Sequence, residues 1–322
     1  MALTYELRDK TSFARTFVDR ELPHLQGLSR AINKRLVCYA DIESAKHANF
    51  YLYTLIGTAI DYRIRAFFAP APHLGGTVHG GLVMIKGADF AGGEGLEFPN
   101  KLTLFKKKGQ RLVEDFNSAS EKLLSELGPT NRRLAPAEED RLCRFCLLLA
   151  RLDHARRNWD TSYFAEDMRI GDFDIDVHIS AADPTLVADL VALAGQAFEQ
   201  RRSDIFANFS VVHHGCALAG SADVGGADLD LVVDGRLIEI KTTIKPKITT
   251  DNLRQIVGYL LLDYEDEFEI RSACIYLVRQ GHLEPFQVQG DLIPSDKSLS
   301  VLRVAFREGF RKSKDKRPRV ED

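Results

Sequence analysis

Four charged residues that flank one predicted turn are the side chains of this chain best suited to do chemistry: Asp228, Asp230, Glu239 and Lys241. They lie in the stretch GADLDLVVDGRLIEIK (226–241), where charged and apolar residues alternate. An Asp-Gly pair, Asp234-Gly235, stands between the two alternating runs. It predicts a two-residue β-hairpin, because the type I′ turn needs positive φ at both central positions.

The position of the turn determines which residues of the two strands face each other. Pairing outward from the turn sets Asp230 opposite Glu239 and Asp228 opposite Lys241. Because side chains alternate between the two faces of a strand, all four are expected to project from one face. The other face is expected to carry four apolar side chains: Leu229, Leu231, Ile238 and Ile240.

Three carboxylates on one small patch predict a metal site. Directly opposed Cβ atoms lie ~4.5–5.5 Å apart, and like charges at that separation destabilise a sheet. A hard divalent cation would remove the repulsion, and Mg²⁺ is typically held by one or two carboxylates together with water and substrate phosphate. Three glycines before the acids, Gly220, Gly225 and Gly226, would permit close backbone approach. The alternative interpretation is the ordinary charged face of a half-solvated strand.

A predicted helix after the hairpin brings two further polar residues to one face. Gln255 and Tyr259 are four residues apart in DNLRQIVGYLLLD (251–263), the spacing of neighbours on a helix surface. Together, GGADLDLVVDGRLIEIKTT and NLRQIVGYLLL resemble the PD-(D/E)XK nuclease superfamily, in particular its RecB-like branch. The resemblance implies four catalytic residues: Asp230, Glu239, Lys241 and Gln255.

A second segment, GTAIDY (57–62), resembles the upstream helix motif of the same branch, where a His commonly stands at the position of Asp61. A surface acid on a helix is the alternative reading of Asp61. The resemblance implies Mg²⁺ or Mn²⁺ as the cofactor, held by five oxygen ligands: Asp230, Glu239, the backbone carbonyl of Ile240, Asp228 and Asp61. The sequence departs from the motif in two ways, because no Pro precedes Asp230 and because Asp228 competes with it for the first position.

These residue types suit the hydrolysis of a phosphodiester. The metal would activate a water and polarise a phosphoryl oxygen, while Lys241 would orient that water or bind a non-bridging oxygen. Lys245 and Lys247 follow and are either phosphate contacts or solvated lysines. His213 and His214 are neighbours, and neighbouring strand residues face opposite sides, so at most one of them is expected to reach the site.

Five widely spaced cysteines predict free thiols. Cys143 and Cys146 form a CxxC pair on a predicted helix (136–158), where burial on one helix face accounts for both. RecB-like members with an iron–sulfur cluster carry clustered cysteines near the C-terminus. This chain has no such group in its sequence, so no cluster is expected.

The composition of the chain is that of an ordinary globular protein. It has 322 residues, a net charge of −3, 45% apolar residues and 28% charged residues. No apolar run approaches the ~20 residues of a membrane span, and the first residues do not resemble a signal peptide. We therefore expect a soluble cytoplasmic protein without a membrane partner, which would bind nucleic acid through a local basic surface.

The pattern of predicted elements favours an α/β (α+β) protein, and the resemblance implies a restriction-endonuclease-like core with a mixed central sheet flanked by helices. Residues 1–183 are expected to form a mainly helical N-terminal region, with a Gly-rich loop at 75–95 and a long helix at 43–68 that could join the core. Residues 184–311 are expected to form the nuclease core, in the order helix, three strands, helix and strand. The basic tail 312–322 is expected to be disordered.

The expected function is a metal-dependent nuclease that acts on nucleic acid, with DNA as the preferred substrate and phage defence or DNA repair as the setting. A homodimer and a subunit of a larger complex are both open. One alternative is a catalytically silent nuclease-fold subunit that binds nucleic acid within a complex. Another is an unrelated α+β protein whose hairpin mimics the motif. A dinucleotide enzyme is disfavoured, because no GxGxxG follows a predicted strand.

Overall fold

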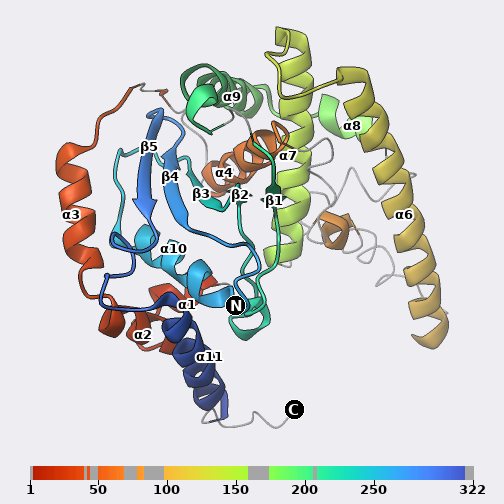
Figure 1. Cartoon of the computed structure of the whole chain (residues 1–322). Helices are drawn as coiled ribbons and strands as arrows, with labels where there is room; N and C mark the ends of the chain where they lie inside the picture. Colours follow the sequence, from red (N-terminus) through yellow and green to blue (C-terminus); the bar gives the residue numbers. More distant parts are fainter. Residues whose placement is uncertain are drawn as a thin grey trace. The chain divides into compact units, whose positions relative to one another are not determined.

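The chain folds into two compact units, Met1–Asp41 with Ala207–Asp322, and Ile42–Phe206. The computed structural model (Figure 1) describes residues 3–39, 42–43, 50–68, 78–82, 98–158, 174–205 and 209–315. The first unit holds a mixed sheet with helices, and the described part of the second is helical. None of the helices in the described ranges combines the length and the apolar character that a bilayer-spanning segment requires.

The first unit is built on a five-stranded mixed sheet in the order β1-β2-β3-β4-β5. Its strands are β1 (Val212–His214), β2 (Leu231–Val233), β3 (Arg236–Lys241), β4 (Ser272–Leu277) and β5 (His282–Gln287). The neighbours β3 and β4 are parallel, and all other neighbours are antiparallel. The parallel pair needs a crossover, which the helix α10 (Thr250–Leu262) provides. The predicted order of helix, three strands, helix and strand is confirmed.

The hairpin forms at the predicted turn. Asp234 and Gly235 both have positive φ, 47° and 72°, and β2 and β3 pair in the predicted register from Val233 to Leu231. The ladder ends with the pair Leu231–Ile238.

The prediction that the ladder continues through the acids is wrong, because the paired strands become irregular at this point. Asp228 forms an isolated bridge with Ala217 rather than a pair with Lys241. Gly215, with φ 58°, donates its backbone N–H to the carbonyl of Leu229, which lies next to Asp230 in the chain. A positive φ inside a strand pair bends the chain and interrupts the regular hydrogen bonds. Leu229 joins the same apolar cluster as Leu237, not the opposite face as predicted.

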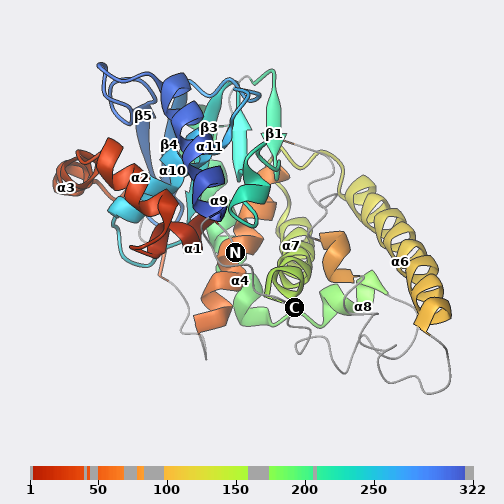
Figure 2. The ribbon, with the colours of Figure 1, turned by 90° about the horizontal axis from the view of Figure 1, so that it is seen from below.

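One face of the sheet forms a single apolar cluster with five helices. The helices are α1 (Leu3–Arg8), α2 (Phe13–Glu21), α3 (Leu25–Arg35), α10 and α11 (Leu299–Asp315). Figures 1 and 2 show α10 along this face, with α1 and α2 beside it, and α11 packs on α10 and α2. The strands contribute alternate residues to the cluster, as the twofold period of a strand requires: Val232, Leu237, Ala273, Ile275 and Leu277.

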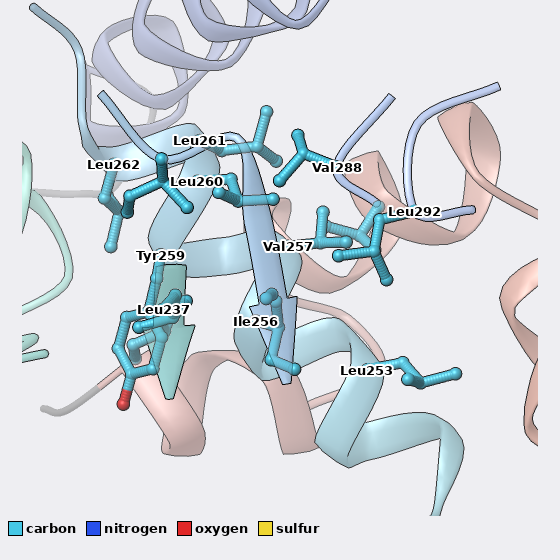
Figure 3. Close-up of a cluster of buried hydrophobic side chains, with 14 of the residues drawn as sticks. Leu237, Leu253, Ile256, Val257, Tyr259, Leu260, Leu261, Leu262, Val288 and Leu292 are labelled. Carbon is cyan, nitrogen blue, oxygen red and sulfur yellow. The ribbon is translucent and has the colours of Figure 1, made fainter. Parts of the chain in front are cut away.

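The helix α10 lies at the centre of this cluster (Figure 3). It begins with a capping box, in which the Thr249 side chain accepts from the backbone N–H of Asn252 and the Asn252 side chain accepts from that of Thr249. Its C-terminal half is buried nearly all round, and Leu260, Leu261 and Leu262 are each fully buried. A helix that is apolar on every side needs partners on every side. The sheet, α1, α2, α3 and α11 supply them.

The two units do not follow the expected division at residue 184. Helices α1 to α3 belong to the unit of the sheet, because their apolar side chains enter the α10 cluster. Conversely, α9 (Pro184–Ile205) packs on α4 (Phe50–Arg65) and α7 (Pro136–Asn158) in the second unit. The prediction that the segment 43–68 forms one helix is met only from Phe50 to Arg65 within the described residues.

Two further helices of the second unit are α6 (Phe98–Leu127) and α8 (Ile175–Ser180), which contact each other. Cys143 and Cys146 are fully buried on α7. All five cysteines are free thiols, as predicted. Burial raises the pKa of Cys146 to about 12, so this thiol is neutral and unreactive.

Two predicted irregular segments are only partly described. Of the Gly-rich stretch 75–95, the structure describes residues 78–82, which are helical rather than the loop expected there. Gly81 lies so close to Leu152 of α7 that an added Cβ would stand 2.1 Å from the Leu152 carbonyl oxygen. The prediction of a disordered tail from residue 312 is wrong for its first residues, because α11 continues to Asp315. Residues 316–322 lie outside the described ranges.

Gly258 on α10 is where α1 crosses most closely. A Cβ built there would lie 3.0 Å from Leu3 Cδ2 and 3.3 Å from Leu7 Cδ1. We expect Gly258→Leu to force α1 away and to lower the free energy of unfolding by about 1–3 kcal/mol. Urea unfolding followed by circular dichroism measures the change.

The matched control for this variant is Gly27→Leu on α3, where an added Cβ meets nothing within 4 Å. It replaces a glycine within a helix of the same unit and is expected to leave stability unchanged or to raise it by up to about 1 kcal/mol. Equal unfolding midpoints for the two variants would contradict the close contact between α1 and α10.

Candidate functional site

The candidate site is built around a buried carboxylate on the middle of the sheet. Glu239 lies on β3, which is paired on both edges, and its side chain is 1% exposed. Its Oε1 accepts a hydrogen bond from Lys241 Nζ at 2.5 Å. Its Oε2 is buried and has no hydrogen-bond partner. A buried carboxylate oxygen without a donor is costly, so such a group points to a ligand or a proton that the oxygen would bind.

Asp230 stands beside Glu239 because the regular ladder stops at Leu231. The backbone N–H of Ile240 lies past the last ladder pair, and it donates to Asp230 Oδ2 at 3.2 Å. This hydrogen bond turns the Asp230 carboxylate toward β3. Burial and, next, the negative charge of Asp230 raise the pKa of Glu239 to about 7. The charge of Asp230 thus opposes the ionisation of Glu239, and the two carboxylates lie close together, as the sequence pattern predicted.

Lys241 connects this carboxylate pair to α10. Besides Glu239, its Nζ donates to Gln255 Oε1 at 3.0 Å, and Gln255 Nε2 donates to the hydroxyl oxygen of Tyr259 at 2.8 Å. Burial alone would lower the pKa of Lys241, but the charges of Glu239 and Asp230 outweigh burial and raise it. Lys241 is therefore a fixed ammonium ion at neutral pH. The predicted catalytic residues Asp230, Glu239, Lys241 and Gln255 form one connected group.

Tyr259 holds the end of this chain of hydrogen bonds. Its ring belongs to the apolar cluster, and Figure 3 shows it beside the other side chains of α10, with its hydroxyl at the end turned away from them. The hydroxyl accepts from Gln255, which leaves the Gln255 carbonyl oxygen directed at Lys241. The i, i+4 spacing on α10 predicted that these two residues share a face, and this is confirmed.

The structure places the other candidate ligands as follows. Asp228 lies two residues before Asp230, at the isolated bridge with Ala217. The N–H of Ile240 is bound by Asp230, and the role of its carbonyl as a ligand stays a prediction. Asp61 belongs to α4 in the second unit, where it is buried and accepts from Arg65 at 3.0 Å. Its role as a metal ligand stays a prediction.

Two further pairs of residues were candidates for catalysis or for phosphate binding. His213 lies on β1, and its ring packs edge-on against Phe268 at 5.2 Å between centroids. This apolar contact accounts for the residue. Lys245 and Lys247 are exposed in the loop between β3 and α10. That loop is tied to α3, because Asn33 donates to the carbonyl of Ile248 at 2.7 Å.

Sequence reasoning missed one cation at this site, Arg8 at the end of α1. Its positive charge acts on Lys241 and lowers the pKa of that lysine, against the larger effects of the two carboxylates. Arg8 is more than 200 residues away from the hairpin in the sequence. No local pattern around Arg8 indicates this proximity, because it arises from the packing of α1 on α10.

The donor set fits a hard divalent cation. Within the described residues, no group of three or more His, Cys, Asp or Glu side chains converges as a complete cage. Mg²⁺, however, is usually held by one or two carboxylates and keeps several waters. Asp230 and Glu239 supply two carboxylates, and Glu239 Oε2 is a buried oxygen with no donor. Soft ligands are absent from this group, so its chemistry favours Mg²⁺ or Mn²⁺ over zinc.

Comparison with known proteins gives no independent assignment of the fold or of the site. No family model, curated protein or solved structure matches the chain.

Proposed function

We propose that this chain is a metal-dependent nuclease that hydrolyses phosphodiester bonds, with DNA as its substrate and Mg²⁺ or Mn²⁺ as its cofactor. The observation that carries the proposal is the fully buried Glu239 carboxylate, which has one oxygen without a donor and stands beside a second carboxylate and an ammonium ion. A purely structural Glu–Lys pair would need neither the second carboxylate nor the unsatisfied oxygen.

Asp230 and Glu239 would hold the metal, with Asp228 and the Ile240 carbonyl as further proposed ligands. A bound divalent cation lowers the pKa of water and polarises phosphoryl oxygens. Asp230 is oriented by its hydrogen bond from Ile240, and Glu239 by its hydrogen bond from Lys241. Both carboxylates are therefore fixed before a metal arrives, which reduces the entropy cost of binding it.

Lys241 would bind a non-bridging oxygen of the scissile phosphate or orient the attacking water. Its ammonium group has three donors, and Glu239 and Gln255 take two of them. The third is left for the substrate. Because the pKa of Lys241 is raised, the group is charged when the substrate binds, and it stabilises the negative charge that builds up on the phosphate. Gln255 and Tyr259 keep it in place.

The fold supports the same proposal. A mixed sheet whose first three strands are antiparallel, and whose third and fourth strands are joined by a crossover helix, agrees with the α+β nuclease core that the sequence resemblance implies. In this arrangement the acids lie on β3 and just before β2, and the glutamine lies on the crossover helix. We propose that the sheet unit is a restriction-endonuclease-like core.

The proposal predicts that Glu239→Gln and Lys241→Ala each lower cleavage of DNA by about 10²–10⁴-fold, because each removes a group that acts directly on the metal, the water or the phosphate. Plasmid and single-stranded oligonucleotides, incubated with Mg²⁺ or Mn²⁺ and analysed on gels, measure the rate. EDTA should abolish it.

Matched controls are Glu265→Gln and Lys312→Ala, which make the same kinds of change at exposed positions of the same unit. They should cut as the wild type does. Cleavage that survives in both site variants would refute the active-site assignment. A wild-type protein that binds metal and DNA without cutting would favour a catalytically silent nucleic-acid-binding subunit.

A second prediction concerns the metal alone. Mn²⁺ at ten times its Kd should stabilise the folded wild type by about 1.4 kcal/mol. For a protein of this size such a gain raises Tm by a few degrees, about 2–4 °C per kcal/mol. Differential scanning fluorimetry, with calorimetric titration for the Kd, measures both quantities without any nucleic acid.

The stabilisation by Mn²⁺ should be lost in Asp230→Asn and Glu239→Gln, because an amide is a weaker ligand for a hard cation than a carboxylate. It should be kept in Glu265→Gln, which is remote from the carboxylate pair. Equal stabilisation of all four proteins would show that the metal binds elsewhere.

A further inference from the structure

The short helix α1 is held within the sheet unit both at its start and along its length. At its start, the backbone N–H of Leu3 donates to the carbonyl of Gly226 at 3.0 Å, in the turn that leads to the acids of the hairpin. Along its length, Leu3 and Leu7 pack against Gly258, the point on α10 that has no side chain. Helix α1 is therefore a fixed part of the sheet unit.

The contacts of Arg15 show which end of α1 lies near the candidate site. Its Nη1 donates both to the carbonyl oxygen of Leu7, at 2.8 Å, and to Asp251 Oδ1, at 3.1 Å. The C-terminal end of α1 therefore lies at the first turn of α10. Gln255, which is bound to Lys241, follows Asp251 by one helical turn. The last residue of α1, Arg8, is thereby brought to the side of α10 where Lys241 lies.

The side chain of Arg8 is exposed and forms no ion pair or hydrogen bond within the described part of the chain. The carbonyl oxygen of Leu7 at the end of α1 is already bound by Arg15, so Arg8 is not needed as a cap. Arg8 follows Leu7 directly in the chain, so its charge lies at the end of α1 that Arg15 joins to the first turn of α10, one helical turn before the glutamine that binds Lys241. Two cations placed near each other, with one of them unpaired, favour the binding of an anion.

We propose that Arg8 binds a phosphate of the nucleic acid backbone next to the scissile phosphate, and so positions the strand over Lys241 and the carboxylate pair. This inference rests on the proposed nuclease function. A guanidinium is suited to the task, because its planar donors match two oxygens of one phosphate and because it carries its charge at every physiological pH.

Binding to DNA without cleavage tests the proposal. Fluorescence anisotropy of a labelled duplex of about 20 base pairs is measured with Ca²⁺ in place of Mg²⁺ over a range of salt concentrations. A gel confirms that the DNA stays intact. We expect Arg8→Ala to weaken binding about tenfold, as the loss of one charged hydrogen-bonded contact should. The slope of log K against log salt should become smaller by about 1, the contribution of one phosphate.

Two variants make the result specific. Arg8→Lys keeps the charge and should keep the salt slope while losing part of the affinity, because an ammonium cannot bind one phosphate with two parallel donors. Arg311→Ala removes an exposed arginine near Tyr264, beyond the other end of α10, and should change neither quantity. Because both arginines are exposed, neither substitution is expected to unfold the protein, and Tm is measured for each variant as a check.

The possible outcomes separate this inference from the function on which it rests. If the wild type binds DNA and Arg8→Ala binds it with the same Kd and salt slope, the assignment of Arg8 is wrong and the nuclease proposal stands. If the wild type does not bind DNA at all, both are wrong. If Arg8→Ala and Arg311→Ala weaken binding equally, Arg8 contributes only general charge and the assignment is again wrong.

Discussion

The burial of the Glu239 carboxylate is the constraint on which the rest of the site depends. A carboxylate in the middle of a sheet must be protonated, paired or bound to a cation, because the interior does not solvate its charge. Lys241 pairs with one of its oxygens and leaves the other without a donor. Gln255 accepts a second hydrogen bond from Lys241 and fixes it from the side of α10. The chemistry of β3 thus requires that α10 lie across the sheet at a defined position.

The apolar cluster supplies that position. The C-terminal half of α10 is buried on all sides, so the helix is stable only while the sheet and the surrounding helices enclose it. Gly258 lets α1 approach closely, and Arg15 joins the end of α1 to the first turn of α10. The same packing that buries leucines therefore aligns one polar face of α10 with Lys241. Core packing and site geometry cannot be changed independently here.

Local patterns in the sequence were sufficient to predict the parts of the site whose residues lie close together in the chain. The Asp-Gly turn predicted the register up to Leu231–Ile238, and the i, i+4 spacing predicted the shared face of Gln255 and Tyr259. Features that depend on contacts between distant segments could not be predicted from local patterns. The interruption of the ladder beside Asp230 depends on the partner strand, through Gly215. The placement of Arg8 depends on a contact between residues about 250 positions apart. The three helices α1, α2 and α3 likewise belong to the sheet unit because of contacts between residues far apart in the chain.

In the proposed nuclease, the charges of the site would connect the binding of the metal to that of the substrate. With the further proposed ligand Asp228 left aside, Asp230 and Glu239 carry two negative charges when ionised, and Lys241 and Arg8 carry two positive charges, so these four side chains are balanced without any ligand. A divalent cation would favour the ionised form of Glu239, whose pKa is otherwise raised to about 7, and it would leave an excess of two positive charges. Each phosphodiester brings one negative charge, so the scissile phosphate and its neighbour would restore the balance. Metal and nucleic acid would then each strengthen the binding of the other, because neither alone leaves this group both neutral and fully ionised.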